Sequence, residues 1–251
     1  MSSSTPGGAA PRLYHLQPLI AGPVDHWPAH FPRIRAMAFD GVHVASPFAA
    51  GSEGSLAVPA EPFLLDRRLA GDDAEAYPAL ARLAAAAGEH ELALWVELIV
   101  PVAAEDGLLA RTHPHWIARD GQGVPRHAGA TGGVVLALDA EDEAQLEHMT
   151  ARGRMCLDAG VRGLRFTAAH RVPAAFWRTL LARLRAHRPE AWFVADVLGA
   201  PASALAELAG VGFDGVLDSS RWWNFHDGWF LEQHHARSEE RRVGKECATG
   251  C

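Results

Sequence analysis

The side chains that could do chemistry in this chain are few. Arg165, Thr167 and His170 lie close together in the sequence, Glu97 lies upstream of them, and Asp196 lies downstream. An arginine can bind a carboxylate, so Arg165 and Asp196 predict a structural salt bridge if the fold brings them together. Thr167 has a hydroxyl that is a poor nucleophile without an adjacent base, and it carries no charge with which to stabilise a cation.

Two further groups of residues allow more than one interpretation. Trp222, Trp223 and Phe225 could form a platform on which a sugar ring stacks, although packing in the core is the favoured interpretation. His113 and His115 could be metal ligands, but no third ligand lies at a recognisable spacing, so no metal site is predicted. The chain contains neither GxGxxG nor GxxxxGK, so no phosphate-binding loop or cofactor is predicted.

Alternating strands and helices must position these residues. Hydrophobic patterning predicts strands within 13–20, 41–46, 92–102, 163–166, 192–198 and 215–218. It predicts helices over 25–37, 72–87, 139–159, 173–187 and 201–209, with another beginning near Trp229. The segments 51–65 and 107–131 are expected to be a loop and a long irregular excursion.

This alternation predicts a parallel sheet built from βα units. Right-handed crossovers wind such units into an open sheet or a barrel. A (β/α)8 TIM-type barrel has eight strands and typically about 250 residues. The six predicted strands therefore favour an incomplete barrel of about six βα units, with a short loop excursion after the third strand.

Composition excludes several classes of protein. The chain has 251 residues, 49% hydrophobic and 21% charged, which is typical of a globular protein. No apolar run approaches the roughly 20 residues that span a bilayer, so no membrane segment is predicted. The net charge is −7 and no basic stripe is visible, so no nucleic-acid partner is predicted. No secretion signal is visible, and we expect a cytoplasmic protein.

The last fifteen residues differ from the rest in composition. The only lysine of the chain is Lys245, and two of its three cysteines are Cys247 and Cys251. The segment 237–247, RSEERRVGKEC, looks like the translation of a common sequencing-adapter oligonucleotide. We therefore expect a flexible N-terminus over 1–12, a partial barrel over 13–236 and an adapter-derived artefact over 237–251, with a natural C-terminal part cut off. A natural charged helix is the alternative for the tail.

Four segments in order resemble motifs of the α-amylase superfamily, glycoside hydrolase family 13. GFDGVLDSSRWW at 212–223 is similar to the family's GFDYLFNSSKWW-like phrase, and FVADVLGAP at 193–201 to FFAETLGAP. The segment 159–177 resembles the fourth-strand motif GxRxDaaxxxp, and 95–121 resembles DLVxNH followed by HPEWF. The likeness covers roughly 20–225 and is nearest to glucan transglycosylases and maltosyltransferases. It implies a (β/α)8 barrel.

The resemblance also implies roles for particular residues. Retaining enzymes of this family need a nucleophile and an acid/base, two carboxyl groups about 5–5.5 Å apart. The arginine of the fourth-strand motif matches Arg165, and the nucleophilic aspartate matches Thr167. The acid/base glutamate matches Asp196, which is shorter by one methylene. The third catalytic aspartate of the family would lie beyond Ala236. These departures predict a catalytically impaired domain.

Several substrate-binding positions follow from the same resemblance. Glu97 matches the first residue of DLVxNH, whose Asn-His pair is Pro-Val here, and His170 matches a substrate-binding Lys or His. Trp222 and Trp223 complete the predicted binding set. An active enzyme that uses another carboxylate remains the alternative, with Asp218 as its candidate nucleophile.

The resemblance implies an α-glucan or a malto-oligosaccharide as ligand. Three functions remain open: an α-glucan-processing glycosidase or transglycosylase with altered residues, a noncatalytic glucan-binding or scaffolding barrel within a longer polypeptide, or an unrelated α/β protein. Further domains of the same polypeptide are its possible partners. An intact second barrel in the full-length gene would favour the noncatalytic alternative.

Overall fold

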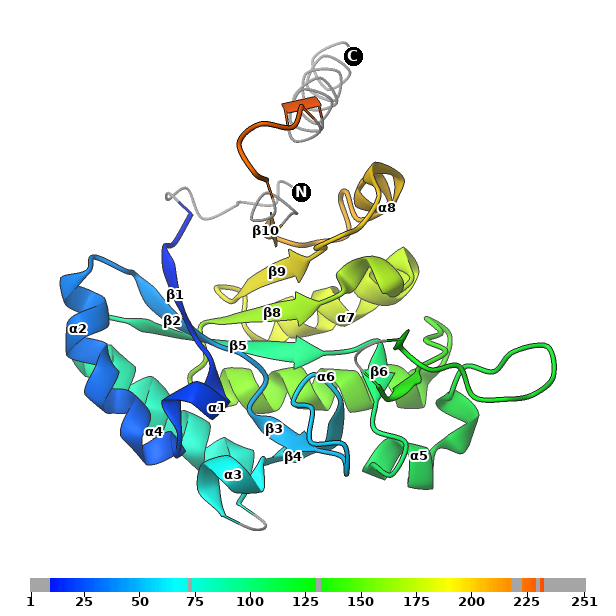
Figure 1. Cartoon of the computed structure of the whole chain (residues 1–251), viewed down its shortest axis with the longest axis horizontal. Coiled ribbons are helices and arrows are strands. Elements are labelled where there is room, and N and C mark those ends of the chain that lie inside the picture. Colours follow the sequence, from blue (N-terminus) through cyan, green and yellow to red (C-terminus); the bar gives the residue numbers. More distant parts are fainter. Residues whose placement is uncertain (1–9, 72–73, 130–131, 218–222, 229–230, 233–251) are drawn as a thin grey trace.

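A single curled sheet organises the chain. The computed structural model describes residues 10–71, 74–129, 132–217, 223–228 and 231–232. Six strands follow the order β1-β2-β5-β8-β9-β10, and every neighbouring pair is parallel (Figure 1). They are β1 (Leu13–Leu16), β2 (Gly41–Val44), β5 (Ala93–Ile99), β8 (Gly163–Thr167), β9 (Trp192–Asp196) and β10 (Gly215–Leu217). The six predicted strands are confirmed.

Helices cover one face of this sheet. The α-helices are α1 (Pro18–Ala21), α2 (Phe31–Ala36), α3 (Arg67–Ala70), α4 (Ala76–Glu89), α5 (Leu108–Thr112), α6 (Glu143–Asp158), α7 (Ala174–His187) and α8 (Ala202–Glu207). Short 3₁₀ helices are η1 (Val24–His30), η2 (Pro114–Trp116) and η4 (Ala169–Arg171). Alternate strand residues such as Val96, Leu164 and Phe193 are buried in the core that the sheet and helices share. The opposite face of the sheet is therefore free to form a cavity.

The five helices predicted between residues 25 and 209 exist, but their boundaries differ. The segment predicted as a helix over 25–37 is the 3₁₀ helix η1 followed by α2, because Pro28 lies inside the first and cannot donate a backbone hydrogen bond. Helix α4 begins at Ala76 rather than at residue 72. Helix α6 begins at Glu143 because the side chain of Asp142 caps it, accepting from the backbone N–H of Gln145 at 3.0 Å.

The segment 51–65 is the predicted loop only up to residue 58, and residues 59–65 form a strand instead. Strands β3 (Phe48–Ala50) and β4 (Pro59–Leu65) form an antiparallel ribbon. A two-stranded ribbon has edges on which proline is tolerated, so Pro59 does not break it. The buried Asp66 fixes the ribbon by accepting from the backbone N–H of Ala50 at 3.1 Å and from the side chain of Arg68 at 2.6 Å.

The excursion after β5 lies at the carboxyl ends of the strands (Figure 1). It contains α5, η2 and a two-stranded ribbon of β6 (Val102–Ala103) and β7 (Val134–Val135). Trp116 anchors it: its indole is buried and donates to Asp142 at 2.9 Å. This contact holds the excursion next to the start of α6.

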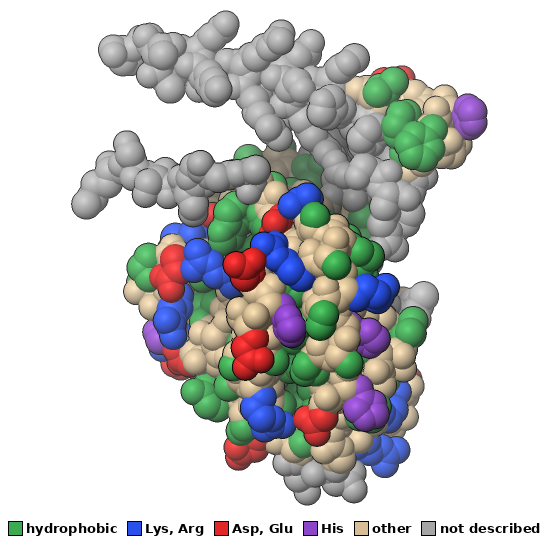
Figure 2. All heavy atoms as spheres, turned by 90° about the vertical axis from the view of Figure 1, so that its left-hand side faces the viewer, with side chains coloured by type: hydrophobic (Ala, Val, Ile, Leu, Met, Phe, Trp, Pro, Cys, Tyr) green, Lys and Arg blue, Asp and Glu red, His purple; other side chains and the backbone are tan. Residues whose placement is uncertain are grey.

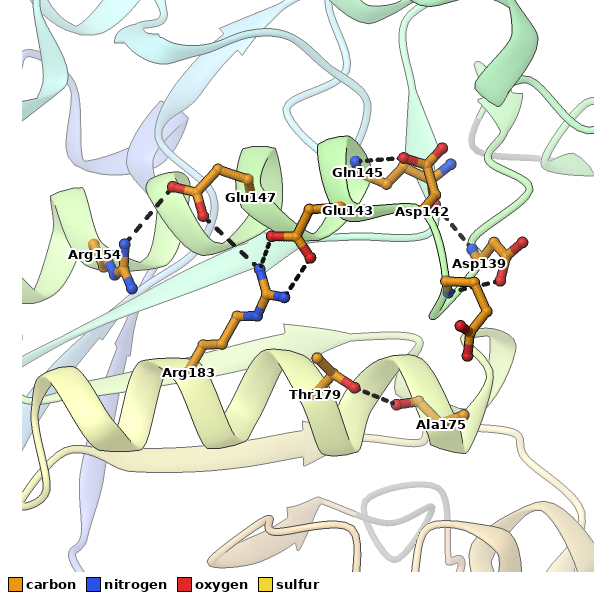
Figure 3. Close-up of polar contacts among 10 residues, drawn as sticks. Asp139, Asp142, Glu143, Gln145, Glu147, Arg154, Ala175, Thr179 and Arg183 are labelled. Carbon is orange, nitrogen blue, oxygen red and sulfur yellow. Dashed lines mark hydrogen bonds and ion pairs between the residues drawn. The ribbon is translucent and has the colours of Figure 1, made fainter.

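Helices α6 and α7 pack side by side against the sheet. A side chain at Gly153 would place its Cβ 2.7 Å from Leu184, so the close approach of the two helices requires glycine. Outside this contact, Arg183 binds both carboxylate oxygens of Glu143, at 2.9 and 2.7 Å, and approaches Glu147 (Figure 3). These exposed ion pairs orient the helix pair and add little to stability.

The surface carries charges of both signs. Figure 2 shows basic and acidic side chains next to each other on the face that it presents, without a basic stripe. Among the described residues, no helix is long and apolar enough to cross a membrane. Cys156 is buried and unpaired, and burial raises the pKa of its thiol to about 12. It is therefore an inert core residue.

Candidate functional site

The free face of the sheet lines an open cavity of about 890 Å³. Strand pairing arranges its side chains in rows, because residues in register on neighbouring parallel strands point to the same face. The first row, called here the histidine–tryptophan row, contains His15, His43, Trp95 and Trp192, with Gly163 between the tryptophans. The second, called the charged row, contains Glu97, Arg165 and Val194. Both rows lie within the cavity lining.

Arg165 is the centre of the charged row. Its Nη1 lies 3.1 Å from Oε2 of Glu97 on β5, and its Nη2 donates to Oδ2 of Asp196 on β9. The side chains of Glu97, Arg165 and Asp196 are only 12%, 14% and 5% exposed. The structure therefore brings three of the predicted site residues together as one buried ion cluster.

Asp196 is fully engaged in this cluster. Besides the bond from Arg165, its Oδ1 accepts from the backbone N–H of Leu198 at 3.1 Å. The predicted salt bridge between Arg165 and Asp196 therefore exists. Both carboxylate oxygens of Asp196 therefore accept hydrogen bonds from within the protein.

Thr167 and His170 lie beside the cluster. Thr167 ends β8 in register with Ile99, and its side chain lines the same cavity. Ala168, the next residue, has a left-handed backbone with φ +52°, which turns the chain sharply into η4. His170 is half-buried in η4, and burial lowers the pKa of its imidazole, with Arg171 adding to the effect. A neutral imidazole is therefore favoured there.

The carboxylate of Glu97 lines the cavity but is almost completely buried. Burial raises the pKa of Glu97 above its ordinary value, and the positive charge of Arg165 and the hydroxyl of Thr167 oppose that rise. The negative charge of Asp196 also raises the pKa of Glu97. Two carboxylates thus share one guanidinium, and Glu97 binds a proton more readily than it would in water.

The histidine–tryptophan row was not predicted to be part of the site. His15 and His43 stack with ring centroids 5.1 Å apart, and their Nδ1 atoms are 2.9 Å apart. Burial lowers the pKa of His43 well below its ordinary value, with Arg165 and His15 adding to the effect. Trp95 packs across Gly163, where a Cβ would lie 2.4 Å from the indole. The period-two alternation of GVHV and ALWVELI was the signal that could have placed His43 and Trp95 on this face.

The remaining predicted residues lie elsewhere. Trp222, Asp218 and the helix expected near Trp229 are at positions outside the described residues, as is the tail over 237–251. Trp223 is half-buried and packs on Phe225, whose side chain is 78% exposed. Neither residue belongs to the buried core of the described residues. The core packing that was favoured for this cluster is therefore wrong for Trp223 and Phe225.

The rings of His113 and His115 both pack against Trp116. The ring of His113 stacks on Trp116 with centroids 3.9 Å apart, and His115 meets the same indole at 5.8 Å. Within the described part of the chain, no group of three or more His, Cys, Asp and Glu side chains is arranged to hold a metal ion.

Two curated relatives are similar to this chain in sequence. An α-1,4-glucan:maltose-1-phosphate maltosyltransferase from Burkholderia pseudomallei (strain K96243) is 34% identical over 242 residues, which cover 94% of this chain and 21% of that protein. A maltosyltransferase of the same description, numbered 2, from Streptomyces coelicolor is 25% identical over 214 residues, covering 77% and 32%. The chain thus spans about a fifth and a third of these relatives. No model of a known protein family matches it.

Solved structures with low sequence identity share the fold. A maltogenic α-amylase from Thermotoga neapolitana superposes with a TM-score of 0.70 at 19% identity, over 86% of this chain and 51% of that one. An α-amylase from Lactobacillus plantarum gives 0.69 at 17% identity, over 95% and 60%. These likenesses confirm the predicted fold class, an incomplete (β/α) barrel, and exclude an unrelated α/β architecture.

Proposed function

We propose that this α-amylase-family domain, which is close to the maltosyltransferase-like members, is an α-glucan-processing domain whose own catalytic centre is impaired. The observation that carries the proposal is the buried ion cluster of Glu97, Arg165 and Asp196 beside Thr167. Thr167 ends β8, where this fold places catalysis, and is the residue that the resemblance matches to the family's nucleophile; Arg165 holds Asp196 in a buried ion pair.

The chemistry of the site supports impairment. A retaining mechanism needs one carboxylate free to attack the sugar and a second carboxyl group free to donate a proton. Here Thr167 supplies no carboxylate, and both oxygens of Asp196 already accept hydrogen bonds. Glu97, with its raised pKa, is also bound to Arg165. Thr167 and the ion cluster of Glu97, Arg165 and Asp196 therefore lack the free pair of carboxyl groups that the reaction requires.

The names of similar proteins support a class of ligand. The names of both curated relatives describe maltosyl transfer involving α-1,4-glucan. One structural neighbour, from Arthrobacter globiformis, is a hydrolase of a cyclic maltosyl-maltose, with a TM-score of 0.68 at 15% identity over 84% of this chain and 55% of that one. We therefore propose that the ligand is an α-glucan or a malto-oligosaccharide. We also propose that the protein acts in the cytoplasm and uses no metal or cofactor.

A noncatalytic role in a longer polypeptide is the second candidate. The matched segment is 21% of the Burkholderia relative, so about four fifths of that enzyme lies outside the match. Its maltosyltransferase activity need not reside in the part that resembles this chain. On this alternative the barrel binds glucan or supports a neighbouring domain. The proposed limits, 13–236 for the barrel and 237–251 for an artefact, apply to both candidates.

Two measurements on the purified chain test the proposal. Hydrolysis of an activated α-glucoside and transfer to maltoheptaose should both be undetectable, because no free carboxylate pair is present. Calorimetry with maltoheptaose should detect binding. Turnover by the unaltered chain would contradict impairment. Absence of binding, together with absence of turnover, would contradict both the α-glucan-processing and the glucan-binding assignments.

A further inference from the structure

His15 and His43 join two neighbouring strands through their side chains. His15 lies on β1, the first strand in the order of the described sheet, and His43 lies opposite it on β2. Their Nδ1 atoms are 2.9 Å apart, while the ring centroids are 5.1 Å apart and the ring planes differ by 20°. Most of the distance between the rings is therefore the line between the two Nδ1 atoms, and these atoms face each other as donor and acceptor.

The number of protons on this histidine pair decides whether its hydrogen bond exists. A neutral imidazole carries a proton on one nitrogen, and an imidazolium carries one on both. The bond therefore persists while one of the two Nδ1 atoms is bare, and it is lost when both rings are charged. We propose that the pair of His15 and His43 is an acid-sensitive contact that holds β1 against β2 and releases β1 when both rings are protonated. This inference is independent of the proposed function.

The surroundings of His43 oppose a charge on its ring. His43 is 4% exposed, whereas His15 is exposed, and both line the cavity. Burial lowers the pKa of His43 well below its ordinary value of 6.5, and the positive charges of Arg165 on β8 and of His15 act in the same direction. The neighbour of His43 on β5 is the uncharged Trp95, and Glu97, one step further along β5, is bound to Arg165. A proton on His43 is therefore bound more easily once β1 has separated.

The other side-chain contacts of β1 and its flank do not include a histidine. Arg12 binds Asp40 just before the strand and lowers the pKa of that carboxyl group, so this exposed pair persists where histidines titrate. Tyr14 meets Phe39 edge to face and accepts a hydrogen bond from Arg33 at 3.1 Å. Among the contacts printed by geometry for this strand, the histidine pair is thus the one that mild acid should break. Because β1 lines the cavity, its release would open the cavity on that side.

Hydrogen exchange measured by mass spectrometry on the purified chain tests the release. After correction for the intrinsic exchange rate, the amides of β1 should lose protection by about tenfold or more between about pH 7.5 and about pH 5, because the released strand binds a proton that the closed pair rejects. The amides of β5, inside the sheet, should keep their protection. Unchanged protection of β1 would overturn the proposal, and so would an equal loss in both strands, since the sheet would then open as a whole.

The variant His43→Asn removes the titrating ring from the pair. Its side-chain amide keeps a donor and an acceptor, so it can meet His15 in either protonation state. Protection of β1 should then be the same at both pH values. The matched control is His127→Asn, at an exposed position of the excursion, which should retain the loss seen in the unaltered chain. A loss of the same size in His43→Asn would show that the histidine pair is not the sensor.

Long-range proton–nitrogen NMR spectra of the unaltered chain decide the case in which His43→Asn does not fold. At about pH 7.5, one of the two Nδ1 atoms should carry a proton and the other should be bare. On acidification both rings should become fully protonated, with a midpoint that coincides with the loss of protection in β1. Two bare or two protonated Nδ1 atoms at the higher pH, or a midpoint far from that loss, would contradict the proposal.

Discussion

Arg165 on β8 donates to Asp196 on β9, so two residues separated by a whole helix in the sequence share one hydrogen bond at the centre of the sheet. The same guanidinium also binds Glu97 on β5. One side chain thus connects three neighbouring parallel strands on the face that lacks helices. The stability of this face should depend on that single residue more than on any one carboxylate.

Replacing Arg165 by methionine should therefore be severely destabilising. The change keeps much of the side-chain volume but leaves two buried carboxylates without their counter-ion, and removing one partner of a buried pair typically costs about 3–5 kcal/mol. Urea denaturation at pH 7 measures it. Arg12→Met, which breaks the exposed pair with Asp40, is the matched control and should change stability by less than about 1 kcal/mol. Equal effects would show that the cluster is effectively solvated.

Glu97 should give the chain a pH dependence opposite to that of most carboxylates. Its pKa is raised in the folded state above the ordinary value of 4.5, so the folded state binds a proton more tightly than the unfolded state. The resulting stabilisation is fully present below about pH 4.5 and is lost as the pH rises through the raised pKa. The difference in unfolding free energy between the unaltered chain and Glu97→Gln should therefore fall with rising pH in that window. A difference that rises there would contradict the assigned direction.

Arg152 makes the core of α6 less stable than it could be. It is 3% exposed, its Nη1 faces the sulfur of Met149 at 3.2 Å, and its Nε and Nη2 have no hydrogen-bond partner among the residues that the structure describes. Burial lowers its pKa to about 10. Arg152→Met should stabilise the chain by roughly 1–3 kcal/mol, because it removes an unpaired buried charge. Arg178→Met, at an exposed position of α7, should change stability by less than about 0.5 kcal/mol. Destabilisation by Arg152→Met would mean that this guanidinium has a partner in solution.

Hydrophobic periodicity was enough to predict the sheet. Segments such as ALWVELI combine apolar residues with β-branched ones and are bounded by turns, so their local preference agrees with the tertiary structure. Prediction from local composition failed where contacts between distant segments determine the secondary structure. Strand β4 contains Pro59 and Pro62 and was predicted as a loop, yet pairing with β3 and the cap at Asp66 hold it extended.

The site was predicted only in part for a similar reason. The resemblance indicated Arg165, Thr167 and Asp196 as site residues. The opposite charges of Arg165 and Asp196 then predicted the salt bridge between them. Glu97 was predicted to bind substrate, which stays a prediction; its ion pair with Arg165 was not predicted. Which strand neutralises a buried arginine depends on strand register, because only register determines which side chains face each other across the sheet. No feature of the sequence near Glu97 specifies that register.

The tail offers a separate test of the predicted domain limits. Deleting 237–251 removes four basic and three acidic residues, so the net charge changes from −7 to −8. The unfolding free energy of the remaining chain should stay within about 0.5 kcal/mol, because side chains of an artefact are not selected to pack. Thermal unfolding of the two chains checks this. A clear loss of stability would show that the tail is a natural element.

Repair of the site requires two changes together. Thr167→Asp with Asp196→Glu restores the two carboxyl groups that a retaining mechanism uses, and either change alone leaves one of them unrestored. We therefore expect the double variant to gain activity on an α-glucan and both single variants to remain inactive on it. The gain should be small, because the family's third carboxylate is not among the restored groups.

α-Glucosyl fluoride is the substrate that isolates the repaired step. Fluoride leaves without needing a proton from an acid, so turnover reports mainly on the nucleophile at position 167. The double variant should hydrolyse it at least about tenfold faster than the unaltered chain, since general acid–base and nucleophilic groups typically contribute factors of a hundred or more. Asp at position 167 would also form a glycosyl ester, which intact-mass measurement detects as one added hexosyl unit. Asn at the same position, in the otherwise identical double variant, cannot form it. Equal or faster hydrolysis by the unaltered chain would mean that another carboxylate acts as nucleophile, and Asp218 would then be the residue to substitute.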